Sequence, residues 1–161
     1  MKGLELFFQL VKFLPQLQIL QIGNTPNICS ELVDRLKECG GSLDLIADKK
    51  IECDSDIVTQ KIKEYNTTLN IKARNYENVI VTDIFDDLSD EQIKSLLTEC
   101  YHSLENSAEL AIIIKKDMKL QYRVHKALDE IEYRAINDDV GIFDDYYVLT
   151  AKKLHMWGNG Q

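Results

Sequence analysis

The chain has 161 residues, of which 45% are hydrophobic and 29% are charged, and its formal net charge is -8. This length and composition predict a single globular domain over residues 1–161, with a sizeable core. The acidic balance, with lysines and arginines scattered along the chain, argues against general binding to nucleic acids or to anionic membranes.

The N-terminal residues 1–16 are rich in apolar side chains. These recur at three- and four-residue steps, which predicts one face of an amphipathic helix, made of Leu4, Phe7, Phe8, Val11 and Leu14. Polar residues interrupt the stretch and no small-residue cleavage site follows, so we expect neither a signal peptide nor a membrane span. We predict that this helix packs on the domain. The alternative is a partner surface, for example of a homodimer, because the phenylalanines present a large apolar area.

Short apolar stretches alternate with helical patterns along the rest of the chain. Strand patterns cover residues 17–22, 42–47, 77–84, 109–114 and 146–154, and helical patterns cover residues 26–39, 55–66, 89–104 and 118–132. This alternation predicts an α/β fold of three layers, a mostly parallel Rossmann-like sheet with helices on both faces. After the last helix, two strand patterns are joined by the short link DDVGIFDD, which permits only an antiparallel pair.

Three helix ends carry chemical signals. Thr25-Pro26 suits an N-cap followed by proline in the first helical turn. Ser89 and Gln92 form the sequence pattern of a capping box. Gly40 predicts a left-handed end for the helix before it.

The four cysteines give no sign of a metal site. None forms a CxxC pair, and no histidine stands at a zinc-ligand spacing from them. Cys29, Cys39 and Cys100 fall within helical patterns, where a buried free thiol is the simplest interpretation. We therefore predict a reducing, cytoplasmic location rather than a disulfide scaffold.

The candidate site follows from the strand order, because ligands in open α/β sheets bind beyond the carboxyl ends of the strands, beside the first one. Gly23 follows the first strand and permits close approach of the backbone to a ligand, between Gln21 and Asn24. Asp48 closes the second strand, where an acid is placed to accept hydrogen bonds from both hydroxyls of a ribose. Asp83 closes the central strand and is placed to bind a cation or an ammonium group.

Each of these residues also has a simpler structural explanation. A single glycine after a strand is often only a turn, and an aspartate before two lysines suits a solvated loop. The acids around Asp83 suit the N-terminus of a helix, where the helix dipole favours negative charge. The sequence contains no serine-histidine-aspartate set, HExxH or phosphate-binding loop.

The order of these pieces resembles the class I S-adenosylmethionine-dependent methyltransferases over about residues 18–157. ILQIGNTPN is similar to the first motif of that family, GGSLDLIAD to the second strand with its ribose-binding acid, and YENVIVTDIFDDLSDE to the central strand and the next helix. DYYVLTAKKLHMW resembles the final antiparallel strand. The resemblance implies a seven-stranded sheet and S-adenosylmethionine as cofactor. It also implies that Phe85 faces the substrate and that the cofactor is held by Gln21, Gly23, Asn24, Asp48 and Asp83.

Several positions depart from the family pattern. Gln21 stands where the first motif normally has an acid, and Thr25 and Asn27 replace its later glycines. The third strand region, taken as TTLNIKARNYEN, lacks the acid that usually lies near the adenine, and Asn75 is the nearest polar residue. These losses remove groups that the family uses to hold its cofactor.

Two functions are therefore weighed. The first is an S-adenosylmethionine-dependent methyltransferase that acts on a small molecule or a protein. The alternative is a non-catalytic methyltransferase-like binding or assembly module that has lost its cofactor. A side chain that fills the space between Gly23 and Asp48, such as Tyr76 or Asn27, would favour this alternative. A receiver or flavodoxin-type domain is a third reading, but the first strand lacks the acids that a receiver needs.

Overall fold

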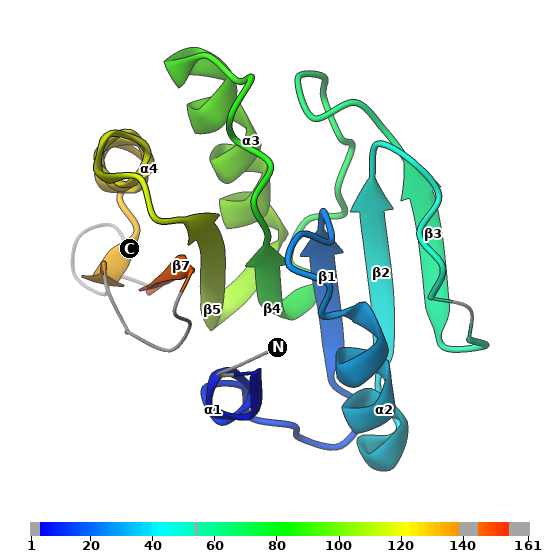
Figure 1. Ribbon diagram of the computed structural model, residues 1–161. Coiled ribbons are helices and arrows are strands. Elements are labelled where there is room, and N and C mark those ends of the chain that lie inside the picture. Colours follow the sequence, from blue (N-terminus) through cyan, green and yellow to red (C-terminus); the bar gives the residue numbers. More distant parts are fainter. Residues whose placement is uncertain (1–3, 54, 139–144, 155–161) are drawn as a thin grey trace.

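A computed structural model describes residues 4–53, 55–138 and 145–154. These residues form a seven-stranded sheet in the order β3-β2-β1-β4-β5-β7-β6, with helices packed on it (Figure 1). The strands are β1 (Gln18–Ile22), β2 (Ser42–Ala47), β3 (Val58–Ile62), β4 (Tyr76–Val81), β5 (Leu104–Lys115), β6 (Arg134–Asn137) and β7 (Tyr146–Lys152). The helices are α1 (Leu4–Phe8), α2 (Cys29–Cys39), α3 (Asp90–Ser103) and α4 (Met118–Ile131).

Strands β1 to β5 run parallel and form most of the sheet. Residues 79–81 of β4 and 110–114 of β5 are buried, as expected for apolar strands that are covered on both faces. Ile22, the last residue of β1, lies opposite Ile46 of β2 and Val81 of β4. The carboxyl ends of these strands therefore meet at one edge, and the predicted mostly parallel α/β sheet is confirmed.

The C-terminal strands run differently. β7 is antiparallel to β5, with Val148 opposite Ile113, and β6 pairs antiparallel with β7. The predicted antiparallel pair is thus confirmed. The link DDVGIFDD lies mostly outside the described residues, as do residues 155–157 of the final motif.

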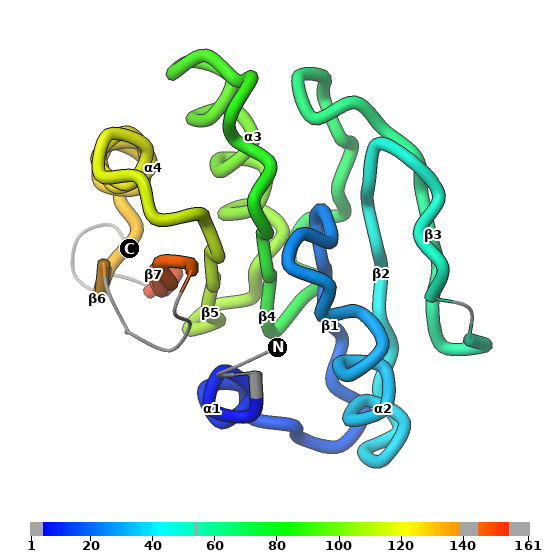
Figure 2. The backbone as a smooth tube through the Cα atoms, viewed as in Figure 1, coloured from blue at the N-terminus to red at the C-terminus, as the bar shows by residue number. Residues whose placement is uncertain are grey.

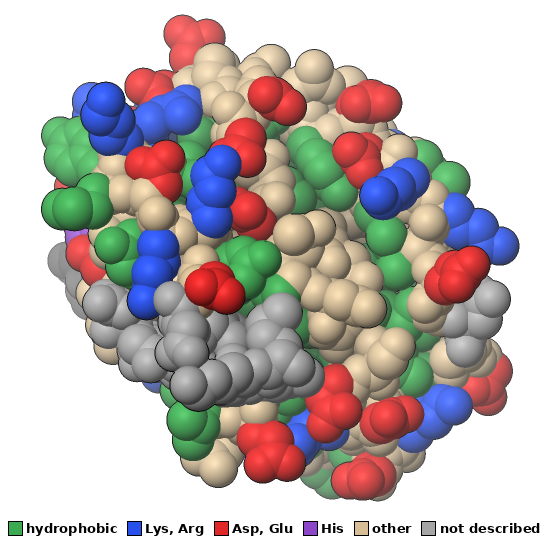
Figure 3. Space-filling view, in the orientation of Figure 1, with side chains coloured by type: hydrophobic (Ala, Val, Ile, Leu, Met, Phe, Trp, Pro, Cys, Tyr) green, Lys and Arg blue, Asp and Glu red, His purple; other side chains and the backbone are tan. Residues whose placement is uncertain are grey.

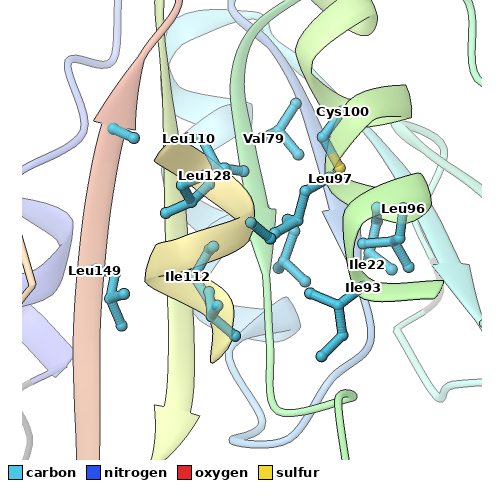
Figure 4. Close-up of a cluster of buried hydrophobic side chains, with 14 of the residues drawn as sticks. Ile22, Val79, Ile93, Leu96, Leu97, Cys100, Leu110, Ile112, Leu128 and Leu149 are labelled. Carbon is cyan, nitrogen blue, oxygen red and sulfur yellow. The ribbon is translucent and has the colours of Figure 1, made fainter. Parts of the chain in front are cut away.

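Helices on the two faces bury two separate clusters of side chains. The cluster under α1 and α2 includes Phe7 and Leu32, and the cluster under α3 and α4 includes Leu97, Leu128 and Ile112 of β5. Figure 4 shows the second cluster, with side chains of α3 and α4 meeting those of the strands. No helix in the described part of the chain is long and apolar enough to cross a membrane.

The prediction of a helix over residues 55–66 is wrong. The chain forms β3 there, paired in parallel with β2, and Leu43 lies opposite Val58. β3 is an edge strand whose side chains are all at least partly exposed, so its sequence lacks the clear apolar alternation of a half-buried strand. Its pairing with β2, rather than a local pattern, decides its conformation.

The connection from β3 to β4, residues 63–75, contains no helix and crosses from the sheet edge to its middle (Figure 2). It is fixed to α3 because the Glu99 carboxylate accepts hydrogen bonds from the amides of Leu69 and Asn70, at 2.9 and 3.0 Å. Leu69 is buried in the core. Beneath this connection, a cavity of about 190 Å³ lies against side chains of β1 and β2, including Leu20 and Ile46.

The N-terminal helix is shorter than predicted, because α1 ends at Phe8 and residues 1–3 lie outside the described residues. Phe7 and Phe8 are buried, with 0% and 2% of their surface exposed. The exposed apolar side chains of this segment are leucines instead, at positions 6, 10 and 14. A homodimer through this segment stays a prediction, and leucines rather than those two phenylalanines would form its surface.

The helix ends agree with two of the three sequence signals. Ser89 and Gln92 form the predicted capping box, and Gly40 ends α2 with a φ of 71°. The N-cap predicted at Thr25 is wrong, because α2 begins at Cys29 and its N-cap residue is Ile28. The turn after β1 is therefore longer than predicted.

The prediction that Cys29 is a free thiol is also wrong. Cys29, the first residue of α2, forms a disulfide with Cys53 in the connection from β2 to β3, with the two Cα atoms 6.2 Å apart. Cys39 and Cys100 are free. The cytoplasmic location was inferred from the expectation of free thiols, and it stays a prediction.

Candidate functional site

The candidate site lies at the edge where the parallel strands end. Backbone hydrogen bonds continue one residue beyond the strands, from the Gly23 amide to the Ile46 carbonyl at 2.8 Å and from the Thr82 amide to the Ile22 carbonyl at 2.9 Å. The Asp83 amide then donates to the Thr25 carbonyl at 2.8 Å. The tips of β1, β2 and β4 are therefore joined, and the tertiary structure brings the sequence-predicted residues to one place.

Gly23 is needed where it stands. Its φ is +79°, a conformation that favours glycine. A Cβ atom there would lie 2.4 Å from Cγ2 of Ile84 and from Oγ1 of Thr82, and 3.6 Å from the Tyr65 hydroxyl. The glycine thus allows side chains of this protein to approach the turn, and they occupy the space beside it.

Gln21 and Asn24 form a hydrogen-bonded unit within this turn. Gln21 is fully buried, and its Nε2 donates to the Gly23 carbonyl and to Oδ1 of Asn24, both at 2.8 Å. The same Oδ1 accepts hydrogen bonds from the amides of Ile28 and Cys29, each at 3.2 Å. The amides of Ile28 and Cys29 at the start of α2 are therefore bound to Asn24. The Oε1 atom of Gln21 is buried without a hydrogen-bond partner.

Asp48 lies at the tip of β2, and its side chain is exposed. Its amide donates to the Tyr65 hydroxyl at 3.2 Å. Because that hydroxyl also lies close to Gly23, Tyr65 fills the space between Gly23 and Asp48. Burial raises the pKa of the Tyr65 hydroxyl, and the negative charges of Asp48 and Glu64 raise it further, against the lowering effect of the Asp48 amide.

Tyr65 is not among the predicted site residues, because residues 55–66 were predicted to form a helix. The side chains predicted for this space, Tyr76 and Asn27, lie elsewhere. Tyr76 begins β4, at the opposite edge of the sheet, where its hydroxyl donates to Asp44. Asn27 is exposed and accepts a hydrogen bond from Nδ2 of Asn24 at 3.0 Å.

The position of β3 decides which polar residues lie at the carboxyl edge, where the family usually has an acid near the adenine. Asn75 precedes β4, and its amide donates to the Ser103 carbonyl, so it lies at the amino edge of the sheet. Glu64, in contrast, follows the carboxyl end of β3 and is exposed. In the sequence, only its place just after the end of β3 could have identified Glu64 as a candidate. The apolar alternation of that edge strand is too weak to predict where the strand ends.

Asp83 and Phe85 follow β4 but have different surroundings. Asp83 is half-buried, and its Oδ1 is buried without a hydrogen-bond partner. Burial raises the pKa of its carboxyl; the Lys115 backbone opposes this shift, and the charge of Asp86 adds to it. Phe85 is 0% exposed and belongs to the core beside α3, which is not the position expected of a side chain that faces a substrate.

Charged groups at this edge are balanced rather than gathered. Nζ of Lys115, at the end of β5, lies 2.7 Å from a carboxylate oxygen of Asp86. On the face shown in Figure 3, acidic and basic side chains are interspersed and form no continuous basic area. This arrangement suits a ligand with hydroxyl or ammonium groups better than it suits a polyanion. The carboxylates of Asp48 and Asp83 would accept hydrogen bonds from such groups.

Known structures show the same arrangement of elements. A SAM-dependent methyltransferase from Aquifex aeolicus matches with a TM-score of 0.75 at 16% identity, over 94% of this chain and 89% of that one. The chain has a class I SAM-dependent methyltransferase-like fold. A SAM-dependent O-methyltransferase from Thermotoga maritima matches this fold with a TM-score of 0.72 at 13% identity, over 95% of this chain and 65% of that one.

A further match is phosphoethanolamine N-methyltransferase 2 from Haemonchus contortus, in complex with S-adenosyl-L-methionine. Its TM-score is 0.70 at 9% identity, over 95% of this chain and 53% of that one. Comparison of the sequence with protein-family models and with curated proteins gives no match. At such identities the likeness establishes the methyltransferase-like fold, and the site has to be judged from its own residues.

The residues of this site fit S-adenosylmethionine in part. The exposed carboxylate of Asp48 and the unpartnered Oδ1 of Asp83 fit the ribose hydroxyls and the ammonium group of the cofactor. The amides at the start of α2 are bound to Asn24, and the space beside Gly23 holds Tyr65. The Asp48 carboxylate is therefore exposed and Oδ1 of Asp83 is buried without a hydrogen-bond partner, whereas the amides of α2 and the space beside Gly23 are used by the protein itself.

Proposed function

We propose that the protein is an S-adenosylmethionine-dependent methyltransferase that acts on a small-molecule or protein acceptor. The observation that carries this proposal is the meeting of Gly23, Asp48 and Asp83 at the carboxyl edge of a methyltransferase-like sheet, beside its first strand. In an open α/β sheet this is the position where ligands bind.

The proposed roles follow from the chemistry of each group. Asp48 accepts hydrogen bonds from the two ribose hydroxyls, and Oδ1 of Asp83 accepts one from the ammonium group of the methionine part. Burying a ligand donor against Oδ1 of Asp83 would satisfy an acceptor that otherwise lacks a partner. The cofactor supplies the methyl group, and the protein contributes mainly by positioning it against the acceptor.

A second candidate function is a non-catalytic binding or assembly module. Two observations favour it: the Tyr65 hydroxyl lies between Gly23 and Asp48, and Asn24 binds the amides at the start of α2. In both cases a side chain of the protein occupies the place or the hydrogen-bond donors that a ligand would otherwise use. The two functions differ in whether an adenosyl ligand binds at all.

Titration of the full chain with S-adenosylmethionine and with S-adenosylhomocysteine tests the proposal. We expect binding at micromolar concentrations by calorimetry. A ligand that binds only the folded state also raises its stability, by about 2.7 kcal/mol at a hundredfold excess over the dissociation constant, so the melting temperature should rise. Absence of binding at millimolar concentrations would reject the methyltransferase and favour the module.

A further inference from the structure

Tyr65 links the two halves of the proposed cofactor site. Its hydroxyl accepts the hydrogen bond of the Asp48 amide at 3.2 Å and lies 3.6 Å from the position that a Cβ atom on Gly23 would occupy. The first distance is that of a hydrogen bond, and the second is ordinary van der Waals contact. The hydroxyl therefore lies in the space that a ligand spanning Gly23 and Asp48 would use.

The backbone around Tyr65 is held from both sides. Before it, the Lys63 amide donates to the Ala47 carbonyl at 2.9 Å, which continues the pairing of β3 with β2. After it, Glu99 of α3 binds the amides of Leu69 and Asn70. Tyr65 itself is half-buried and packs at the margin of the core cluster beneath α3. These backbone anchors do not involve the Tyr65 side chain, so a rotation of that side chain would leave them in place.

We infer that Tyr65 is a gate that closes the adenosyl site and that an adenosyl ligand must displace its hydroxyl from the Asp48 amide. This inference rests on the proposed methyltransferase function. It explains how one edge combines an exposed carboxylate at Asp48 and a buried, unpartnered oxygen at Asp83 with a filled space at Gly23. Binding then includes the loss of one internal hydrogen bond, so the measured affinity is lower than that of an open site.

The gate predicts tighter binding when the hydroxyl is removed. Tyr65→Phe keeps the ring and its packing but removes the hydrogen bond, and Tyr65→Ala removes the ring as well. We expect both variants to bind S-adenosylhomocysteine about 3- to 10-fold more tightly than the wild type, which is the range of one ordinary hydrogen bond. Tyr122→Phe on α4, an exposed tyrosine, is the matched control and should bind like the wild type.

Calorimetry with S-adenosylhomocysteine separates the outcomes. Tighter binding by both Tyr65 variants than by the wild type supports the gate. Binding by the wild type with equal or weaker binding by Tyr65→Phe overturns the gate and leaves the proposed function standing. No binding by the wild type or by either variant at millimolar concentrations overturns the proposed function, and the gate with it.

Hydrogen exchange provides a readout without ligand. The Asp48 amide is bound to the Tyr65 hydroxyl, so it should exchange more slowly in the wild type and in Tyr122→Phe than in Tyr65→Phe. Equal exchange rates in the wild type and Tyr65→Phe would show that the contact is not formed in solution and would overturn the gate.

Discussion

Nε2 of Gln21 donates a hydrogen bond to Oδ1 of Asn24 at 2.8 Å, and that oxygen in turn accepts the amides of Ile28 and Cys29. The residue before α2, Ile28, has no side chain that caps the helix. Asn24 therefore caps α2 from outside the helix, and the fully buried Gln21 holds it in position. The end of β1 and the start of α2 are thus one hydrogen-bonded unit.

Asn24→Ala should lower the free energy of unfolding by about 1–2 kcal/mol, because both amides lose their acceptor. Urea denaturation measures this loss. Asn24→Asp is the matched control: it keeps the accepting oxygen and places a negative charge at a helix N-terminus, where the dipole favours it. A loss in Asn24→Asp as large as that in Asn24→Ala would contradict a capping role.

The Cys29–Cys53 disulfide should stabilise the fold by constraining the unfolded chain, since it joins residues separated by 24 positions. Cys53→Ser is expected to lower the free energy of unfolding by about 2–4 kcal/mol. Denatured wild-type protein should show two free thiols, from Cys39 and Cys100, and all four cysteines only after reduction. Cys39→Ser is the control, and four thiols before reduction would argue against the disulfide.

Asp48→Ala should weaken binding of S-adenosylhomocysteine by about 1–3 kcal/mol if the carboxylate accepts the ribose hydroxyls, because the ligand groups are then left unpaired. Calorimetry on the variant and on the wild type gives this difference. Asp34→Ala, which removes an exposed carboxylate from α2, controls for the change in net charge. Unchanged affinity in Asp48→Ala would remove Asp48 from the site.

Asp83 should make stability depend on pH. Burial raises its pKa in the folded state, so the folded protein holds this proton more tightly than the unfolded chain. The protonated carboxyl therefore contributes to the free energy of unfolding in full at pH values below its pKa in the unfolded chain, about 4. This contribution is lost as the pH rises through the higher pKa of the folded state. The free energy of unfolding of Asp83→Asn should therefore be higher than that of the wild type at pH 7, by roughly 1 kcal/mol. Near pH 4 the difference should be smaller.

Urea denaturation of both proteins at pH 4 and pH 7 measures this difference. Asp87→Asn, an exposed carboxyl on the same connection, controls for the change in net charge. If Asp83→Asn were the less stable protein at pH 7, the folded protein would stabilise the ionised Asp83 carboxylate, and the predicted pH dependence would be wrong.

Two glycines with similar backbone angles should respond differently to alanine. At Gly23, the added methyl group would meet Ile84 and Thr82 at 2.4 Å, so Gly23→Ala should cost about 3 kcal/mol or more, from left-handed strain and overpacking together. Gly40 has a φ of +71° and no atom within 4 Å of a Cβ atom. Gly40→Ala should cost only the strain, about 1–2 kcal/mol. Equal losses in thermal and urea unfolding would contradict the close approach at Gly23.

The sequence by itself determined the central strands, the antiparallel end of the sheet and the ends of several helices. Residues 79–81 and 110–114 are continuous apolar stretches, and the capping box at Ser89 is a local pattern of a few neighbouring residues. Gly23, Asp48 and Asp83 were assigned to strand ends, and the parallel order then brought them to one edge. Such features depend on short-range periodicity and capping, which the sequence contains directly.

The tertiary structure decided the edge strand β3, the disulfide, the burial of Phe85 and the place of Tyr65. Each depends on contacts between residues far apart in the chain: β3 on its pairing with β2, Cys29 on Cys53, and Tyr65 on Asp48 and Gly23. The sequence around residues 55–66 contains no pattern strong enough to show this pairing. The side chain at the centre of the proposed site was therefore set by the fold, because only long-range packing brings Tyr65 between Gly23 and Asp48.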